Sequence, residues 1–232
     1  ITKLLGSAKD IAPSFVDLMQ GRPLVRHSAR PGFLGPVYKP FRPDISPWFK
    51  RPLEAGMKNE LAAQGANHTT SLSLNASMSA DRLQNRSQLL GGLDRFRRDI
   101  DSSRMMDALD QFNQQAAEIL ISGKFAAALD LDREDPRVLK RYTPAISKTK
   151  KFTTAEDHFS MRKFLLARRL IEAGVRCVSV SFSDFDTHSS NFPRMRHMLP
   201  FLDHGLCALV SDLEERGMLD DVSIVAWGEF GR

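Results

Sequence analysis

The chain has 232 residues, of which 42% are hydrophobic, a size and composition that allow a packed core and exclude a disordered tail. Its formal net charge is +5, but the basic residues are spread over several segments, so we do not expect nucleic acid as a partner. No apolar stretch approaches the roughly 18 residues that a bilayer crossing needs. The first residues do not form a signal peptide. We therefore expect a globular chain with no membrane span.

The two ends suggest an incomplete chain. It begins at Ile1, without an initiator Met, and ends at Arg232 directly after an apolar run. We expect a fragment that lacks N-terminal strands and the C-terminal end of its domain. Cys177 and Cys207 fall in apolar periodic segments, where a buried thiol is expected rather than a bridge or a nucleophile.

Residues 1–76 are predicted to be loop-rich. The stretch 21–52 is dense in Pro, Gly and aromatic residues, which excludes a long helix and favours an extended segment that buries its rings on the domain. A partner-binding loop is the alternative.

Residues 77–150 show helical periodicity. Ser79 is a candidate N-cap for a helix that reaches about Asp101. A second helix is predicted from about Ser103 to Ile121, with Gly123 as its stop.

A helix is predicted at the start of residues 151–232. Thr153 and Glu156 have the spacing of a capping box, and Gly174 is a suitable residue just past the helix end. The next eight residues, Val175–Phe182, have the β-branched content of a buried strand.

A second helix and strand complete this core. Pro193 fits the first turn of a helix that ends at Gly217, and Val222–Trp227 reads as a second strand. Strands joined by a helix of this length are expected to be parallel. Their carboxyl ends then lie at one edge of the sheet, where open α/β sheets place their ligands.

Acidic and imidazole side chains follow both predicted strands. Asp184, Asp186 and His188 come after the first strand and Glu229 after the second. Asp186, His188 and Glu229 together suit zinc, manganese or a similar ion. The alternative is structural: Asp-Thr-His caps a helix around a satisfied histidine, and Glu229 pairs with Arg232.

Several motifs resemble a bacterial family named domain of unknown function 1501, over roughly residues 28–232. The motifs are GFLGPVYKPF at 32–41, LLARRLIEAGVR at 165–176, DTHSSNF at 186–192 and GEFGR at 228–232. The family in turn is similar to the sulfatase-like branch of the alkaline phosphatase superfamily. The resemblance implies one partial α/β domain with a doubly wound sheet and a site for one or two divalent metals.

The resemblance also implies roles for single residues. Asp186 and His188 match the Asp-Thr-His metal ligands, Glu229 stands at a later acidic ligand, and Asn191 would orient a ligand or a substrate oxygen. Arg232 also belongs to the matching motifs. Ser183-Asp184-Phe185 replaces the usual glycines and Trp, so Asp184 adds a carboxylate to the loop. The superfamily's nucleophile and first metal ligands come from an early strand that we do not expect in this chain.

The function that the resemblance implies is hydrolysis of a phosphate or sulfate ester, on a small molecule or a polysaccharide, with zinc, manganese or calcium. The alternatives are a catalytically degenerate member that acts as a metal-binding or surface-binding protein, and a polyanion binder suggested by the basic pI near 9.4. Family members carry a twin-arginine export signal, which implies a periplasmic or extracellular parent protein.

Overall fold

The structure of the protein, a computed structural model, describes residues 4, 12–18, 38, 40–43, 45, 78–86, 88, 116–120, 122–143, 156, 158–182, 185 and 187–228. The chain divides into two compact units. Unit 1 comprises Ile1–Asp135 and Arg169–Ser181, and unit 2 comprises Pro136–Arg168 and Phe182–Arg232.

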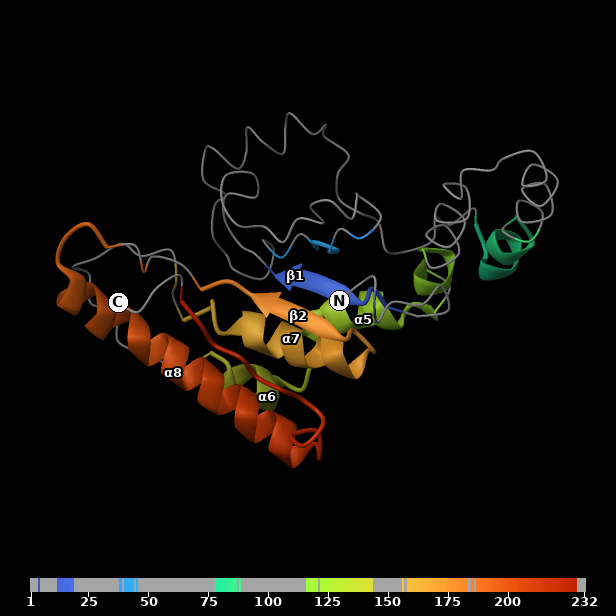
Figure 1. Ribbon diagram of the computed structural model, residues 1–232. Helices are drawn as coiled ribbons and strands as arrows, with labels where there is room; N and C mark the ends of the chain where they lie inside the picture. The colour runs from blue at the N-terminus through green and yellow to red at the C-terminus, as the bar shows by residue number, and fades with distance from the viewer. Residues whose placement is uncertain are drawn as a thin grey trace. The chain divides into compact units, whose positions relative to one another are not determined.

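Unit 1 contains a parallel pair of strands, β1 (Phe15–Leu18) and β2 (Cys177–Val180), which lie side by side in Figure 1. Val16 and Leu18 are fully buried. Asp17 pairs in register with Ser179, whose hydroxyl donates to the Asp17 carboxylate at 2.7 Å, and Arg42 contacts the other carboxylate oxygen at 2.7 Å. The buried acid is thus satisfied by a hydroxyl and a guanidinium.

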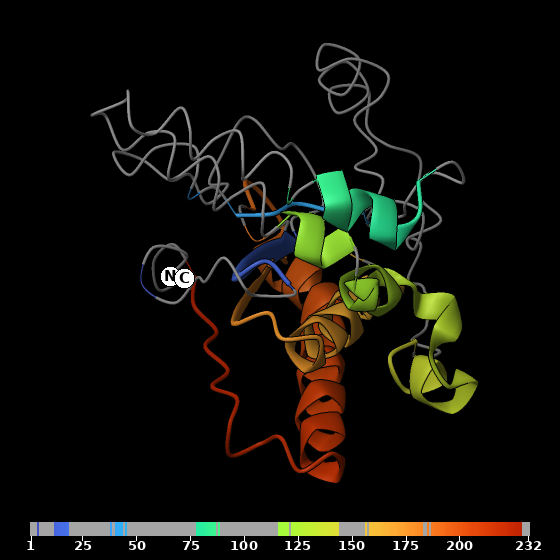
Figure 2. The same cartoon turned by 90° about the vertical axis from the view of Figure 1, so that its right-hand side faces the viewer.

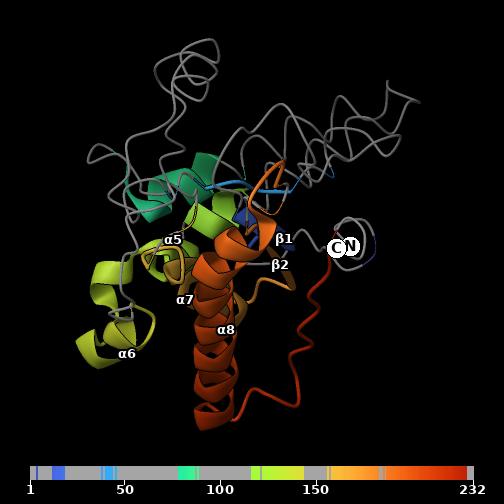
Figure 3. The ribbon, with the colours of Figure 1, turned by 90° about the vertical axis from the view of Figure 1, so that its left-hand side faces the viewer.

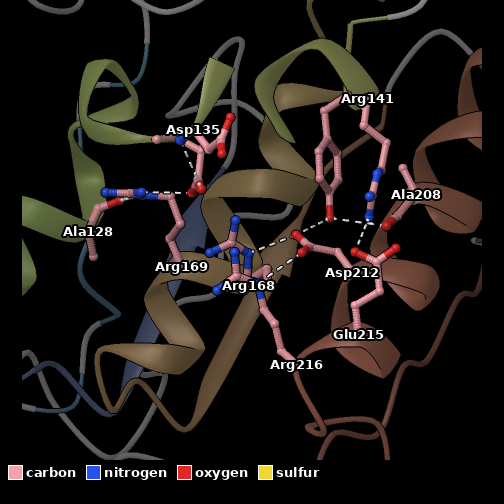
Figure 4. Close-up of polar contacts among 11 residues, drawn as sticks. Ala128, Asp135, Arg141, Arg168, Arg169, Ala208, Asp212, Glu215 and Arg216 are labelled. Atoms are coloured by element: carbon pink, nitrogen blue, oxygen red, sulfur yellow. Dashed lines mark hydrogen bonds and ion pairs between the residues drawn. The ribbon is translucent and has the colours of Figure 1, made fainter. Parts of the chain in front are cut away.

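Helix α5 (Lys124–Leu129) is held at its C-terminal end by Arg169. The guanidinium donates to the carbonyl oxygens of Ala127, Ala128 and Asp130 at 2.6, 2.8 and 3.0 Å. It also pairs with Glu134 at 2.7 Å. Figure 4 shows the contact with Ala128. One side chain therefore satisfies the Ala128 carbonyl and adds a donor to the Ala127 and Asp130 carbonyls, which also accept the amides of Asp130 and Arg133.

Phe41 extends the packing of unit 1. It forms a parallel bridge with Val16, and its ring meets that of Phe125 edge-on at 5.1 Å. The prediction that the aromatic segment lies on the domain is confirmed for this residue. Most of 21–52 lies outside the described residues.

Unit 2 is helical in its described part. It contains α6 (Pro136–Arg141), the first seven residues of α7 (Arg162–Glu172) and α8 (Asn191–Glu215). Helix α8 runs without a break through Pro200 (Figure 3). At Gly205 an added Cβ would lie 2.7 Å from the Met161 sulfur and from the Phe164 ring. Glycine at this position therefore permits close packing of α8 against these residues.

The predicted helix stops at Gly174 and Gly217 are confirmed. Both residues have positive φ, at 99° and 66°. After α7 the amides of Gly174 and Val175 bond to the carbonyls of Ile171 and Leu170, and the same paired pattern follows α8. This is a Schellman motif, in which glycine adopts the left-handed conformation without a Cβ penalty.

Two predicted helix starts have different outcomes. Ser79 is confirmed as an N-cap, because its hydroxyl accepts from the Arg82 amide at 3.2 Å. Helix α7 begins at Arg162, later than the capping box predicted, and Glu156 instead accepts from the Lys163 ammonium. A buried ion pair satisfies this carboxylate better than an amide would. Thr153 and most of the predicted helix at 103–121 lie outside the described residues.

The predicted strand at 222–227 is wrong. Residues 222–228 form neither helix nor strand. Val225 and Trp227 are 72% and 81% exposed. The segment turns back after α8 and runs apart from it (Figure 2). A strand needs a neighbouring backbone and a buried face. Among the described residues β2 pairs with β1 instead, so the argument that placed Glu229 at one sheet edge with His188 no longer holds.

Two further corrections concern burial and the N-terminal third. Cys207 is exposed on α8, whereas Cys177 is half-buried. Cys207 lies on the solvent side of an amphipathic helix, which an apolar run alone does not reveal. Residues 1–76 also contain β1, which the loop-rich prediction missed. The described residues form a mixed α and β structure with parallel pairing, while the larger doubly wound sheet stays a prediction.

A substitution at Gly217 tests the helix-end geometry. No atom lies within 4 Å of an added Cβ, so Gly217→Ala adds only the strain of a left-handed conformation. We expect the free energy of unfolding, measured by urea titration, to fall by about 1 kcal/mol. An unchanged or raised value would contradict a left-handed Gly217.

Candidate functional site

The candidate site is the loop that joins β2 to α8. His188 is exposed in it. Next to it, the Thr187 hydroxyl donates to the Asn191 side-chain oxygen at 2.8 Å, and the Thr187 amide bonds to the Phe185 carbonyl at 2.9 Å. These local bonds shape the turn before α8 and leave the His188 imidazole at the surface.

The loop ends in a backbone conformation that is uncommon for its residue type. Ser190 has φ 53° and ψ 42°, and its side chain makes no capping bond to α8. A non-glycine residue in the left-handed region costs energy, and such residues concentrate at functional sites. The first turn of α8 also contains no acidic residue, so its amide groups favour a negatively charged neighbour.

The other two predicted ligands and two of the predicted lining residues lie outside the part of the chain that the structure describes. Asp184, Asp186, Glu229 and Arg232 lie outside the described residues. Within the described part of the chain, no group of three or more His, Cys, Asp and Glu side chains has the arrangement of a metal site. Of the three predicted ligands, His188 is the one that the structure describes. Its imidazole nitrogen is of the donor type that a divalent metal such as zinc binds.

Asn191 has a local role in the structure. It is the first residue of α8, and its side-chain oxygen accepts the Thr187 hydroxyl. The carboxamide NH₂ lies on the same exposed residue and is the group that would meet a ligand or substrate oxygen.

A buried ionic cluster around Asp212 fixes α8 within unit 2 (Figure 4). Asp212 is 1% exposed. Its carboxylate accepts from Tyr142 at 3.0 Å, Arg168 at 2.9 Å and Arg216 at 2.9 Å. Tyr142 is the residue directly after α6, and Arg168 lies on α7. Three parts of the unit therefore meet at one carboxylate.

The cluster shifts both of its titratable acids. Burial raises the pKa of Asp212, but the hydrogen bond from Arg216, the charge of Arg168 and the bond from Tyr142 together lower it below its usual value. Burial, followed by the charge and hydrogen bond of Asp212, raises the pKa of Tyr142. Asp212 is thus held ionised and Tyr142 protonated, as a structural network requires.

A second buried ion pair joins Lys163 and Glu156. Lys163 and Glu156 are 0% and 2% exposed, with the ammonium 2.9 and 3.1 Å from the two carboxylate oxygens. Sequence reasoning missed this pair and the Asp212 cluster. One signal was present, since Lys163 and Arg168 lie among the apolar residues of the helix predicted to end at Gly174, where an unpaired charge would be costly.

The chain belongs to the family described as Protein of unknown function (DUF1501), whose profile matches residues 1–232. The predicted family membership is thereby confirmed. No curated protein and no solved structure matches the chain significantly. Among the residues that the structure describes, no helix combines the length and apolar character that a bilayer crossing requires.

The Asp212 cluster predicts how stability depends on pH. Because the folded pKa of Asp212 is lowered, its stabilising contribution is complete above its unfolded pKa of about 3.9 and is lost as pH falls through the lower folded pKa. Asp212→Asn should lower the free energy of unfolding by about 3 kcal/mol at pH 7. It should also flatten the loss of stability below about pH 4.

Urea titrations at pH 7 and at lower pH measure both effects. Tyr142→Phe is the milder variant, with an expected loss of about 1 kcal/mol. Arg133→Ala, which breaks only an exposed pair with Asp130, is the control and should leave stability nearly unchanged. Equal losses for Asp212→Asn and Arg133→Ala would refute the cluster's role.

Proposed function

We propose that the protein is a divalent-metal-dependent hydrolase of phosphate or sulfate esters, with Asp186, His188 and Glu229 as metal ligands. The proposed ions are zinc, manganese or calcium. The observation that carries the proposal is the position of His188, exposed in the segment that follows β2 along the chain and precedes the first turn of α8. The carboxyl ends of strands in α/β folds are where ligands and catalytic groups gather.

The surroundings of His188 favour an anionic substrate. The first turn of α8 lacks acidic side chains and contains the backbone amides of Asn191 and Phe192, which favour a phosphate or sulfate oxygen as a neighbour. The exposed carboxamide of Asn191 would hydrogen-bond such an oxygen and orient it. A bound cation would polarise the ester and stabilise the charge that develops on it.

The two arginines in the middle of α7 do not favour a polyanion binder. Arg168 is 2% exposed and pairs with Asp212, and Arg169 is engaged with α5 carbonyls and Glu134. Neither contributes to a surface charge patch of the kind that nucleic acid needs.

The second candidate is a catalytically degenerate member that binds a partner and does not turn over substrate. It is favoured by the apolar side chains that unit 2 exposes, among them Phe192, Val225 and Trp227 at 73%, 72% and 81%. Exposed aromatic groups of this size mark binding surfaces.

Metal content and ester hydrolysis of His188→Ala test the proposal. We expect the full-length protein to retain a divalent metal through dialysis and to hydrolyse an aryl phosphate or an aryl sulfate. His188→Ala should lower kcat/KM by at least about 100-fold. Loss of a residue that only hydrogen-bonds to a metal ligand already costs up to about 100-fold, and loss of the ligand itself should cost more. Elemental analysis and chromogenic assays supply the two measurements.

His197→Ala is the matched control, since it removes an imidazole of unit 2 that packs on Phe201 outside the loop. It should keep both metal and rate. Metal content and rate that His188→Ala leaves unchanged would refute the site. Metal that is bound by the wild type without turnover of either ester would favour the degenerate member.

A further inference from the structure

Lys163 is a fully buried cation near the start of α7. Its side chain is 0% exposed, and both oxygens of the equally enclosed Glu156 carboxylate lie within 3.1 Å of its ammonium. Burying two charges is costly, and an apolar pair of similar volume usually serves a fold at least as well. What such a pair can contribute instead is one fixed local conformation of the groups around it.

Its surroundings connect the pair to the candidate site. The Lys163 ammonium lies 6.0 Å from the centre of the Phe182 ring, within the range of a cation–π contact. Phe182 follows β2 by two residues. Its ring lies 6.0 Å from that of Phe185, at an interplanar angle of 54°, a tilted pair within the contact distance of aromatic rings.

Phe185 is the link to the predicted ligands. In the sequence it stands between Asp184 and Asp186, and its carbonyl accepts the Thr187 amide at 2.9 Å. A continuous series of contacts thus runs from Glu156 through Lys163, Phe182 and Phe185 into the loop that contains His188. The other fully enclosed pair on α7, Arg168–Asp212, joins that helix to α8.

We propose that the Glu156–Lys163 pair is a positioning element that, through Phe182 and Phe185, fixes the loop of the metal site. The inference rests on the proposed function, because the metal is what the loop would hold. Lys163 contacts neither metal nor substrate in this role. It keeps the Phe182 ring in place, and the ring keeps Phe185, and with it the turn that leads to His188, in one conformation before the metal arrives.

The test compares three forms of the full-length protein with the wild type. Lys163→Met combined with Glu156→Met removes both charges together and leaves no unpaired ion. Phe182→Leu keeps apolar volume but removes the ring, and the third form carries all three changes. We expect each change to weaken Mn²⁺ binding, measured by calorimetry, roughly tenfold. The combined form should lose no more than either alone, because both changes break one series of contacts.

Amide hydrogen exchange gives a readout that needs no metal. In the apo protein both changes should speed exchange in the peptide that covers residues 182–190, while a peptide from the C-terminal half of α8 stays protected. Gly217→Ala is the control for a general loss of stability. It should leave the loop peptide and the Mn²⁺ dissociation constant at their wild-type values.

The outcomes separate the two proposals. A wild type that binds none of Mn²⁺, Zn²⁺ and Ca²⁺ in the same calorimetric titrations overturns the proposed function, while faster exchange confined to residues 182–190 still supports the positioning role. Wild-type binding with the charge-free variant unchanged in both readouts overturns the positioning role alone. Losses that are additive, or equal to those of Gly217→Ala, also overturn it.

Discussion

Asp212 bears a negative charge at a position almost closed to water, and the helical unit is arranged around that constraint. A buried carboxylate is tolerated only when charged or hydrogen-bonding partners surround it. Here Tyr142, Arg168 and Arg216 all donate to it. These hydrogen bonds hold the last turn of α8 against the middle of α7 and the end of α6. Helix α8 begins at the candidate site, and the Asp212 cluster holds the opposite end of the same helix.

The sequence predicts local features of the fold, such as helix ends, better than it predicts which strands pair. Ser79, Gly174 and Gly217 act as predicted because capping depends on a few neighbouring residues. Val222–Trp227 has the composition of a strand yet stays exposed, and Phe15–Leu18 forms a strand that its loop-rich surroundings concealed. The composition of a segment shows only that it is compatible with a strand. Strand formation also requires a partner strand from a distant part of the chain.

The candidate site shows the same division. A motif is enough to single out His188 and Asn191, and the structure places both at the junction of β2 and α8. The motif does not reveal that Lys163 and Glu156 form a buried ion pair, since the sequence alone does not say which face of a helix packs against which carboxylate. The Ser190 conformation is equally invisible in the sequence, because serine ordinarily adopts negative φ.

The central claim is that the loop between β2 and α8 binds a divalent metal through His188. X-ray absorption at the zinc edge of the zinc-loaded protein tests it most directly, because the fine structure distinguishes imidazole from oxygen donors. The account predicts a first coordination sphere of mixed nitrogen and oxygen with one imidazole signature, which His188→Ala removes. A sphere of oxygen donors alone, or an imidazole signature that survives in His188→Ala, would contradict it.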